Sequence, residues 1–376
     1  MVLKIIYGLI ILGIIVFLHE GGHFLAALAC GVKVEAFSIG MGPVLLHKKI
    51  RNIDWRISLF PIGGYCSMKG ENDYQNSETD SDFSVCDKDS LYGVSPLKRA
   101  LIAFSGPLAN LLLTFFSFFV IAMTGYSYWS ASNKITLANE VYPEIFSPAA
   151  EAGLCTGDEI IQINSEKIND FSEIFAFVSI HPDEDLQVKV LREGKELEFT
   201  VHTSLDKTTG AGKIGVLSTQ GTTVKREAKR YGFFGAVVQG GKETVKIFKA
   251  SITGIAGLFK GVKITQAVSG PASITTMLGE TVKEGFSEGF RTGLSSVLNF
   301  VALISISLFI MNLLPVPVLD GGLILFSLIE AVFRIRISPK VRYRIQYIGL
   351  AFIAFLFVIA IMGDFNFFLN YGMSKN

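Results

Sequence analysis

The chain has 376 residues, of which 50% are hydrophobic and 18% are charged, and its formal net charge is +1. This length allows two or three domains, and the composition fits a chain that lies partly in a membrane and partly in water. The near-zero charge gives no signature of nucleic-acid binding, so no nucleic-acid partner is expected, and four scattered cysteines argue against a disulfide framework.

Four apolar segments are each close to the length of about 20 residues that a membrane-spanning helix needs. They cover residues 5–29, 101–124, 295–314 and 345–363. The first segment is too long for a cleaved signal peptide, and Lys4 is its only positive flanking charge. The sequence therefore predicts an α-helical polytopic membrane protein.

The first predicted span contains the run His19-Glu20-Gly21-Gly22-His23. Two histidines four residues apart lie on one face of a helix and can share a Zn²⁺ ion, and the glutamate between them can act as a general base. A charged residue at a helix centre costs about 2.5–3.5 kcal/mol on insertion scales, so we expect these side chains to be functional. The alternative is that the histidines face a polar gap between helices.

Residues 44–68 favour two strands, because two β-prone runs are separated by turn-forming residues. The edge of such a hairpin beside a membrane site can bind an extended peptide, or the hairpin can serve only as a cover. Residues 71–90 follow and are expected to form a solvated loop. They are rich in acidic side chains, namely Glu71, Asp73, Glu78, Asp80, Asp82, Asp87 and Asp89.

Residues 127–218 have the composition of a soluble α/β domain. A short helix near Pro148 precedes a Gly157-Asp158 turn, and strands are predicted at 186–191 and 196–202 with a turn at Glu193-Gly194. This arrangement resembles a PDZ domain of the bacterial-protease type. PDZ domains bind peptides or chain ends by strand addition, so the resemblance implies such a ligand.

Residues 219–290 form the next predicted region. Between residues 231 and 260 apolar residues recur at helical spacing, with Lys242, Lys246 and Lys249 on the opposite side. This pattern is typical of an amphipathic helix on the surface of a lipid bilayer. A fifth spanning helix is the alternative, but the lysines interrupt any apolar run of sufficient length.

A third protein ligand for zinc is expected from the segment that begins at Asn312 and ends at Asp320-Gly321-Gly322. Pro315 and Pro317 interrupt helical structure, and irregular backbone at membrane depth is tolerated where it lines a cavity. Asp320 can therefore enter the helix bundle as a ligand. The alternative is that it caps the helix that follows.

The orientation follows from the distribution of Lys and Arg beside the spans. Cationic residues gather in the loop between the first two spans and in the loop between the last two, which places both loops in the cytoplasm by the positive-inside rule. Both termini and residues 127–218 are then extracytoplasmic. The residues counted are Lys48, Lys49, Arg51, Arg56, Lys69, Lys98, Arg99, Arg334, Arg336, Lys340, Arg342 and Arg344.

The motifs taken together resemble the site-2 protease family of intramembrane zinc metalloproteases, specifically its bacterial branch with one external PDZ domain. The resemblance covers nearly the whole chain and rests on the following segments: His19-Glu20-Gly21-Gly22-His23, Gly106-Pro107-Leu108-Ala109-Asn110, Ser269-Gly270-Pro271 and Asn312 to Gly321. It implies that His19, His23 and Asp320 bind zinc and that Glu20 is the general base and acid. Asn312, with Asn110, is the candidate substrate-binding residue.

The resemblance implies an enzyme that cuts the membrane spans of single-span proteins, after a first external cleavage, in a bacterial cytoplasmic membrane with the active site toward the cytoplasm. Two positions depart from the family pattern, Gly21 after the glutamate and Leu323 after Asp-Gly-Gly, and neither is a ligand. The main alternative is a non-catalytic PDZ scaffold with a structural metal. A zinc transporter fits less well, because the polar residues form one cluster rather than a path.

Overall fold

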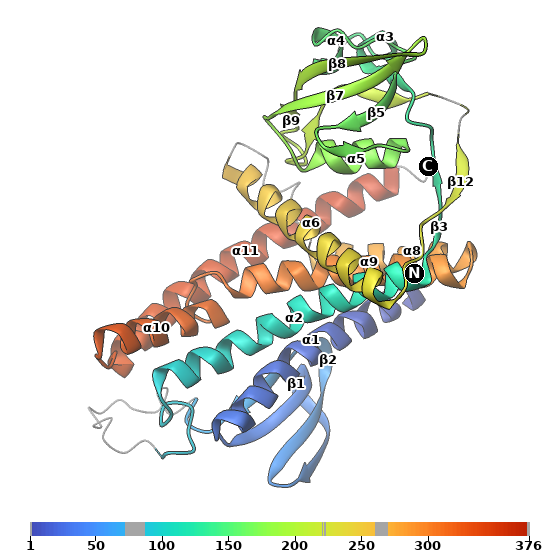
Figure 1. The fold of residues 1–376 in the computed structure, drawn as a ribbon. Helices are drawn as coiled ribbons and strands as arrows, with labels where there is room; N and C mark the ends of the chain where they lie inside the picture. The colour runs from blue at the N-terminus through green and yellow to red at the C-terminus, as the bar shows by residue number, and fades with distance from the viewer. Residues whose placement is uncertain (1, 72–86, 220, 222, 260–269, 374–376) are drawn as a thin grey trace. The chain divides into compact units, whose positions relative to one another are not determined.

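A computed structural model of the chain describes residues 2–71, 87–219, 221, 223–259 and 270–373. The chain divides into two compact units (Figure 1). Unit 1 comprises Met1–Val120 and Gly270–Asp364, and unit 2 comprises Ile121–Ser269 and Phe365–Asn376. The predicted zinc ligands from both ends of the chain therefore belong to unit 1.

The helices of unit 1 include four that are long and apolar enough to cross a membrane: Ile6–Cys30, Pro96–Thr124, Phe290–Asn312 and Arg344–Phe365. They confirm the four predicted spans, with boundaries that differ by a few residues. The helices themselves are α1 (Val2–Cys30), α2 (Pro96–Thr124), α8 (Pro271–Ser287), α9 (Phe290–Asn312), α10 (Asp320–Phe333) and α11 (Pro339–Met373), and both α2 and α11 continue into unit 2. Helix α8, which the sequence assigns to the amphipathic region, packs against α1 and α9.

A curled hairpin of β1 (Val34–Ile50) and β2 (Ile53–Met68) packs against α1. It begins well before residue 44, the predicted start, because β1 passes through Gly40 and Gly42 at positive φ and continues as a strand on both sides. Phe37 pairs with Cys66 on one side and with Trp55 on the other. Residues 54–57 pair in turn with 46–49, so the hairpin forms four antiparallel rows with residues 64–68 as one outer row.

A buried ion cluster joins three helices of unit 1. Glu330 of α10 accepts hydrogen bonds from Arg99 of α2 at 2.8 Å and from Arg342 of α11 at 2.7 Å. All three side chains are nearly inaccessible, with exposures of 5%, 5% and 3% for Glu330, Arg99 and Arg342. Buried charges persist only when they are paired, so this cluster restrains α10 against its neighbours.

Unit 2 is built mainly of short strands around a four-stranded sheet with the order β6-β5-β7-β8. Its elements are β3 (Ser127–Ser130), β4 (Ile135–Leu137), α3 (Ala138–Val141), α4 (Pro148–Glu151), β5 (Glu159–Ile163), β6 (Glu166–Lys167), α5 (Phe171–Ser179), β7 (Asp185–Arg192), β8 (Lys195–His202), β9 (Ser204–Leu205), β10 (Gly212–Lys213), β11 (Val216–Ser218), β12 (Val224–Glu227) and α6 (Phe233–Phe259). Alternating residues of β7, namely Leu186, Val188 and Val190, are buried in its core together with Ile160 and Ile163 of β5.

Strands β7 and β8 occur where the sequence predicts them. They pair from Asp185–His202 to Arg192–Lys195, and Glu193 and Gly194 between them have φ values of 50° and 79°. Positive φ at both central positions is the geometry of a type I′ hairpin turn. The assignment of this region as a PDZ domain stays a prediction.

Helix α6 is a single element of 27 residues. Phe234, Val238 and Val245 recur along one face and are 84%, 59% and 54% exposed. Such an uncovered apolar face fits the predicted bilayer-surface helix, which also stays a prediction. Most of the predicted acidic loop, residues 72–86, lies outside the described residues.

Candidate metal centre

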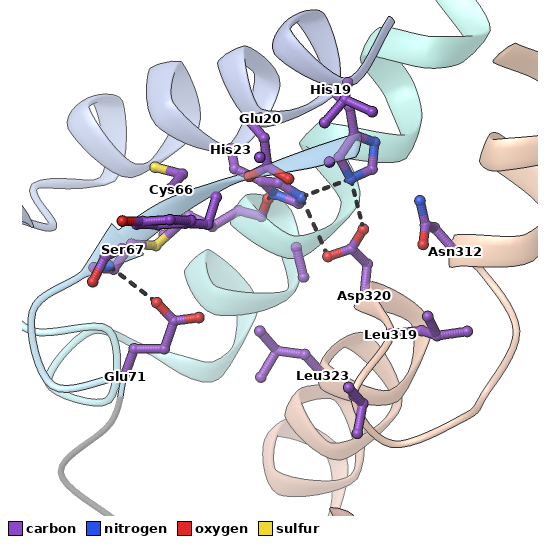
Figure 2. Close-up of a pocket in the computed structure, with 18 of the residues that line it drawn as sticks. His19, Glu20, His23, Cys66, Ser67, Glu71, Asn312, Leu319, Asp320 and Leu323 are labelled. Atoms are coloured by element: carbon purple, nitrogen blue, oxygen red, sulfur yellow. Dashed lines mark hydrogen bonds and ion pairs between the residues drawn. The ribbon is translucent and has the colours of Figure 1, made fainter. Parts of the chain in front are cut away.

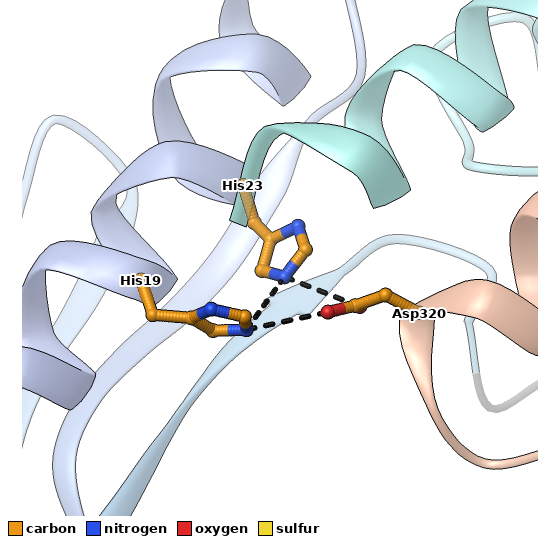
Figure 3. Close-up of side chains that lie close together, drawn as sticks. All are labelled: His19, His23 and Asp320. Atoms are coloured by element: carbon orange, nitrogen blue, oxygen red, sulfur yellow. Dashed lines mark hydrogen bonds and ion pairs between the residues drawn. The ribbon is translucent and has the colours of Figure 1, made fainter. Parts of the chain in front are cut away.

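Three predicted ligands from opposite ends of the chain lie side by side in unit 1 (Figure 3). Nε2 of His19 lies 3.3 Å from Oδ2 of Asp320, and Nε2 of His23 lies 3.3 Å from Oδ1 of the same carboxylate. The two Nε2 atoms are also 3.3 Å apart. The four-residue spacing on α1 places both imidazoles on one helix face, directed at the start of α10.

The path of the chain between α9 and α10 brings Asp320 to the histidines. Helix α9 ends at Asn312, and α10 begins at Asp320 after a non-helical segment in which Val318 has φ of +94°. Leu319, and not Asp320, occupies the N-cap position of α10. The Asp320 carboxylate contacts both imidazoles, which corresponds to the ligand interpretation of the sequence rather than to the cap.

The three side chains fit a zinc ion. Zinc binds imidazole nitrogen and carboxylate oxygen at about 2.0–2.2 Å, so two ligands of a tetrahedral ion are separated by about 3.3–3.5 Å. The two Nε2 atoms are 3.3 Å apart, and each lies 3.3 Å from a different oxygen of the Asp320 carboxylate, which agrees with this value. Three protein ligands leave one position for water or substrate, as in catalytic rather than structural zinc sites.

A cavity of about 770 Å³ adjoins the three ligands (Figure 2). Glu20 and Asn312 line it from α1 and α9, and the outer row of the hairpin, residues 64–68, forms another wall together with Gly63. Asn312, predicted to bind substrate, therefore faces the same space as the zinc ligands. Leu323, where the family pattern often has a histidine, also lies on the wall.

Two charged residues in or beside the hairpin line this cavity outside the spans. Arg56 donates hydrogen bonds to Asp54 at 2.8 Å and to Tyr65 at 3.0 Å, and its hydrogen bond lowers the pKa of Asp54 below the ordinary value. Glu71, which follows β2, accepts a hydrogen bond from the Met68 backbone at 3.0 Å. The wall thus carries a cation that is paired with a carboxylate and one further acidic side chain.

Helix α2 supplies contacts to the far side of both histidines. The Asn110 amide lies 3.0 Å from Nδ1 of His19, and the Ile102 carbonyl oxygen lies 2.8 Å from Nδ1 of His23. Asn110 is fully buried behind His19, so its predicted substrate contact stays a prediction. The role of Ile102 was not predictable, because a backbone carbonyl has no sequence signal.

Gly106 lies between these two contacts on α2. A Cβ atom at this position would overlap the imidazole of His23. The glycine of the Gly106-Pro107 motif therefore makes room for a zinc ligand, a role that the motif alone did not reveal.

Known proteins are similar to this chain over most of its length. Residues 7–356 match peptidase family M50. A protein of Treponema pallidum is 35% identical over 98% of this chain and 100% of its own length, and one of Campylobacter jejuni is 33% identical over 94% and 91%. Both carry the name "putative zinc metalloprotease", as does a protein of Rhizobium meliloti that is 30% identical over 95% of each chain.

Proposed function

Because the chain belongs to peptidase family M50, the site-2 protease family, we propose that it hydrolyses peptide bonds within the membrane spans of other proteins. One observation carries the proposal: His19 and His23 of an apolar helix lie beside Asp320 of α10 at zinc-like separations, and the three side chains adjoin a cavity that Glu20 also lines. A zinc ion held by His19, His23 and Asp320 supplies Lewis-acid activation of water and of the scissile carbonyl.

Glu20 is the residue of this chain that moves the proton. It sits between the two histidine ligands in sequence, and its side chain lines the cavity beside them. As a general base it takes a proton from the attacking water, and as a general acid it passes that proton to the leaving amine.

The substrate is proposed to bind as an extended segment along the outer row of the hairpin. Residues 64–68 pair with β1 on one side only among the described strands, and the same residues line the cavity. Strand addition there would satisfy the main-chain groups of a substrate span that has unwound locally. Unwinding is also required because an intact helix hides its amides in hydrogen bonds; glycine or proline in the target lowers its cost.

The substrates are proposed to be single-span proteins that have already lost most of their external part. The motivation is residues 127–218, whose PDZ-like pattern suits a chain-end sensor or a size filter. We further propose a bacterial cytoplasmic membrane as the location, with the zinc site toward the cytoplasm and residues 127–218 outside, on the basis of the Lys and Arg distribution.

Replacement of the native chain by the Glu20→Gln variant tests the function. We expect zinc to stay bound, because Glu20 is not a ligand, and shortened membrane proteins to accumulate because they are no longer cut. Asp320→Ala should lose both zinc and activity. Metal analysis of the purified variants and a comparison of membrane proteomes measure these outcomes. Unchanged membrane proteins in the Glu20→Gln cells would contradict proteolysis and favour the scaffold.

A further inference from the structure

The side chain of Asn110 is placed to control which nitrogen of His19 is free to bind zinc. Asn110 belongs to α2, is 0% exposed, and its Nδ2 lies 3.0 Å from Nδ1 of His19. Oδ1 of the same amide is buried and has no hydrogen-bond partner among the residues that the structure describes. An unused acceptor therefore lies one rotation of the amide away from the imidazole.

The chemistry of the ligand decides the orientation of this amide. His19 faces Asp320 and His23 with Nε2, so Nε2 must present its lone pair to a metal. A neutral imidazole then carries its proton on Nδ1, which becomes a donor. Because an amide nitrogen cannot accept a hydrogen bond, the amide must present Oδ1; the two orientations differ only by an exchange of nitrogen and oxygen.

We propose that Asn110 is a positioning residue whose Oδ1 accepts the hydrogen bond of the His19 Nδ1–H group, and thereby fixes the tautomer and ring orientation that zinc binding requires. Outer partners of this kind orient metal-binding histidines in many proteins. This role is distinct from substrate binding, which the sequence suggested for Asn110. The zinc-affinity test does not depend on the proposed peptidase function; only the activity measurement rests on it.

His23 also has a hydrogen-bond acceptor beside its Nδ1 atom, but here the acceptor is a backbone carbonyl. Nδ1 of His23 lies 2.8 Å from the Ile102 carbonyl oxygen, which can only accept, so its Nε2 is also free for a metal. Ile102, Gly106 and Asn110 are spaced four residues apart and lie on one face of α2. This face thus supplies an acceptor to each histidine and, at Gly106, the space for the His23 ring.

Zinc affinity of the full-length chain in detergent, measured by competition with a chromogenic chelator, tests the role. Asn110→Leu keeps the approximate volume but removes the acceptor, and we expect it to weaken zinc binding about 10–100-fold. Asn110→Asp can only accept, and we expect it to bind zinc within a few-fold of the native chain. Both variants should show the corresponding changes in peptidase activity at limiting zinc.

Thr114→Val is the matched control. Thr114 lies one turn further along α2, is 0% exposed, and donates to the Asn110 and Ala302 carbonyls at 3.0 and 3.3 Å. Its loss should lower thermal stability without a change in zinc affinity, which separates a packing role from a positioning role.

The proposal is overturned if Asn110→Leu binds zinc as tightly as the native chain, or if Thr114→Val weakens zinc binding equally. If Asn110→Leu does not fold, Asn110→Asp decides alone, because retained tight binding supports an acceptor role and a loss of more than tenfold overturns it. A failure of the proposed peptidase function would instead leave these zinc affinities as expected and abolish only the activity readout.

Discussion

Two adjacent glycines of α1 have different surroundings. At Gly22 a Cβ atom would overlap the Ser105 carbonyl of α2 and would lie 3.1 Å from Cβ of Ala109. At Gly21 no neighbouring atom outside the local helix lies within 4 Å of the corresponding position. Gly22 is therefore required for close packing of the two helices that shape the zinc site, whereas Gly21 borders open space.

Alanine substitutions at the two positions should consequently have opposite effects. We expect Gly22→Ala to destabilise the chain by about 1–3 kcal/mol and to reduce zinc retention, because α1 and α2 must separate. Gly21→Ala should stabilise α1 by up to about 1 kcal/mol through helix propensity. Thermal unfolding in detergent and zinc content measure both. Equal destabilisation by the two variants would contradict the assignment.

At the scale of elements, one ion pair links two strands of unit 2. Arg192, at the end of β7, donates to both carboxylate oxygens of Asp158, each at 2.7 Å, and the Asp158 side chain is only 1% exposed. Burial opposes ionisation of Asp158, but the hydrogen bonds from Arg192 prevail and lower its pKa below the ordinary value of 3.8. A carboxylate with a lowered pKa stabilises the fold above its ordinary pKa, and this stabilisation is lost as the pH falls through the folded-state pKa.

The Arg192→Met variant should therefore be destabilised in a pH-dependent way. At pH 7 we expect a loss of roughly 1–3 kcal/mol, because a buried carboxylate loses its charged partner. The difference from the native chain should shrink as the pH falls through the lowered pKa of Asp158, since the carboxyl group is then protonated in both chains. Hydrogen exchange of the β5 and β7 amides, corrected for intrinsic rates, measures the effect. A difference that does not change with pH would contradict it.

Features that depend on residue type and spacing could be predicted from the sequence, whereas features that depend on packing between elements could not. His19, His23 and Asp320 are recognisable because their chemistry depends on residue type and spacing, and the four spans because apolar length alone identifies them. The sequence does not reveal the early start of β1, because a glycine such as Gly40 usually indicates a turn. In the structure Gly40 has a positive φ and bends a strand that continues on both sides. The contacts of α2 with the histidines were missed because they depend on how two helices pack, which residue type does not encode.

At the scale of the whole molecule, the candidate zinc site and residues 127–218 belong to different units. His19, Glu20, His23 and Asp320 lie in unit 1, and residues 127–218 lie in the part of unit 2 that falls between α2 and α8 in the chain. The proposed substrate filter can therefore be removed without removing a residue of the candidate site.

Deletion of residues 127–218 should leave zinc binding intact and relax substrate selection. If this segment filters substrates by size, the shortened enzyme should cut a full-length single-span protein that the native enzyme cuts only after external truncation. Cleavage of full-length and truncated versions by both enzymes, followed by gel electrophoresis, measures the change. Equal cleavage of both substrates by both enzymes would exclude a filter.

The origin of the ligands in two distant parts of the chain has a consequence for biosynthesis. The ribosome adds about 5–20 residues per second, so α1 is made well before Asp320 emerges. Two histidines alone form an incomplete zinc site, and the third candidate ligand is added only when the start of α10 has been made. If the proposed site is correct, it can therefore assemble only after most of the chain has been synthesised.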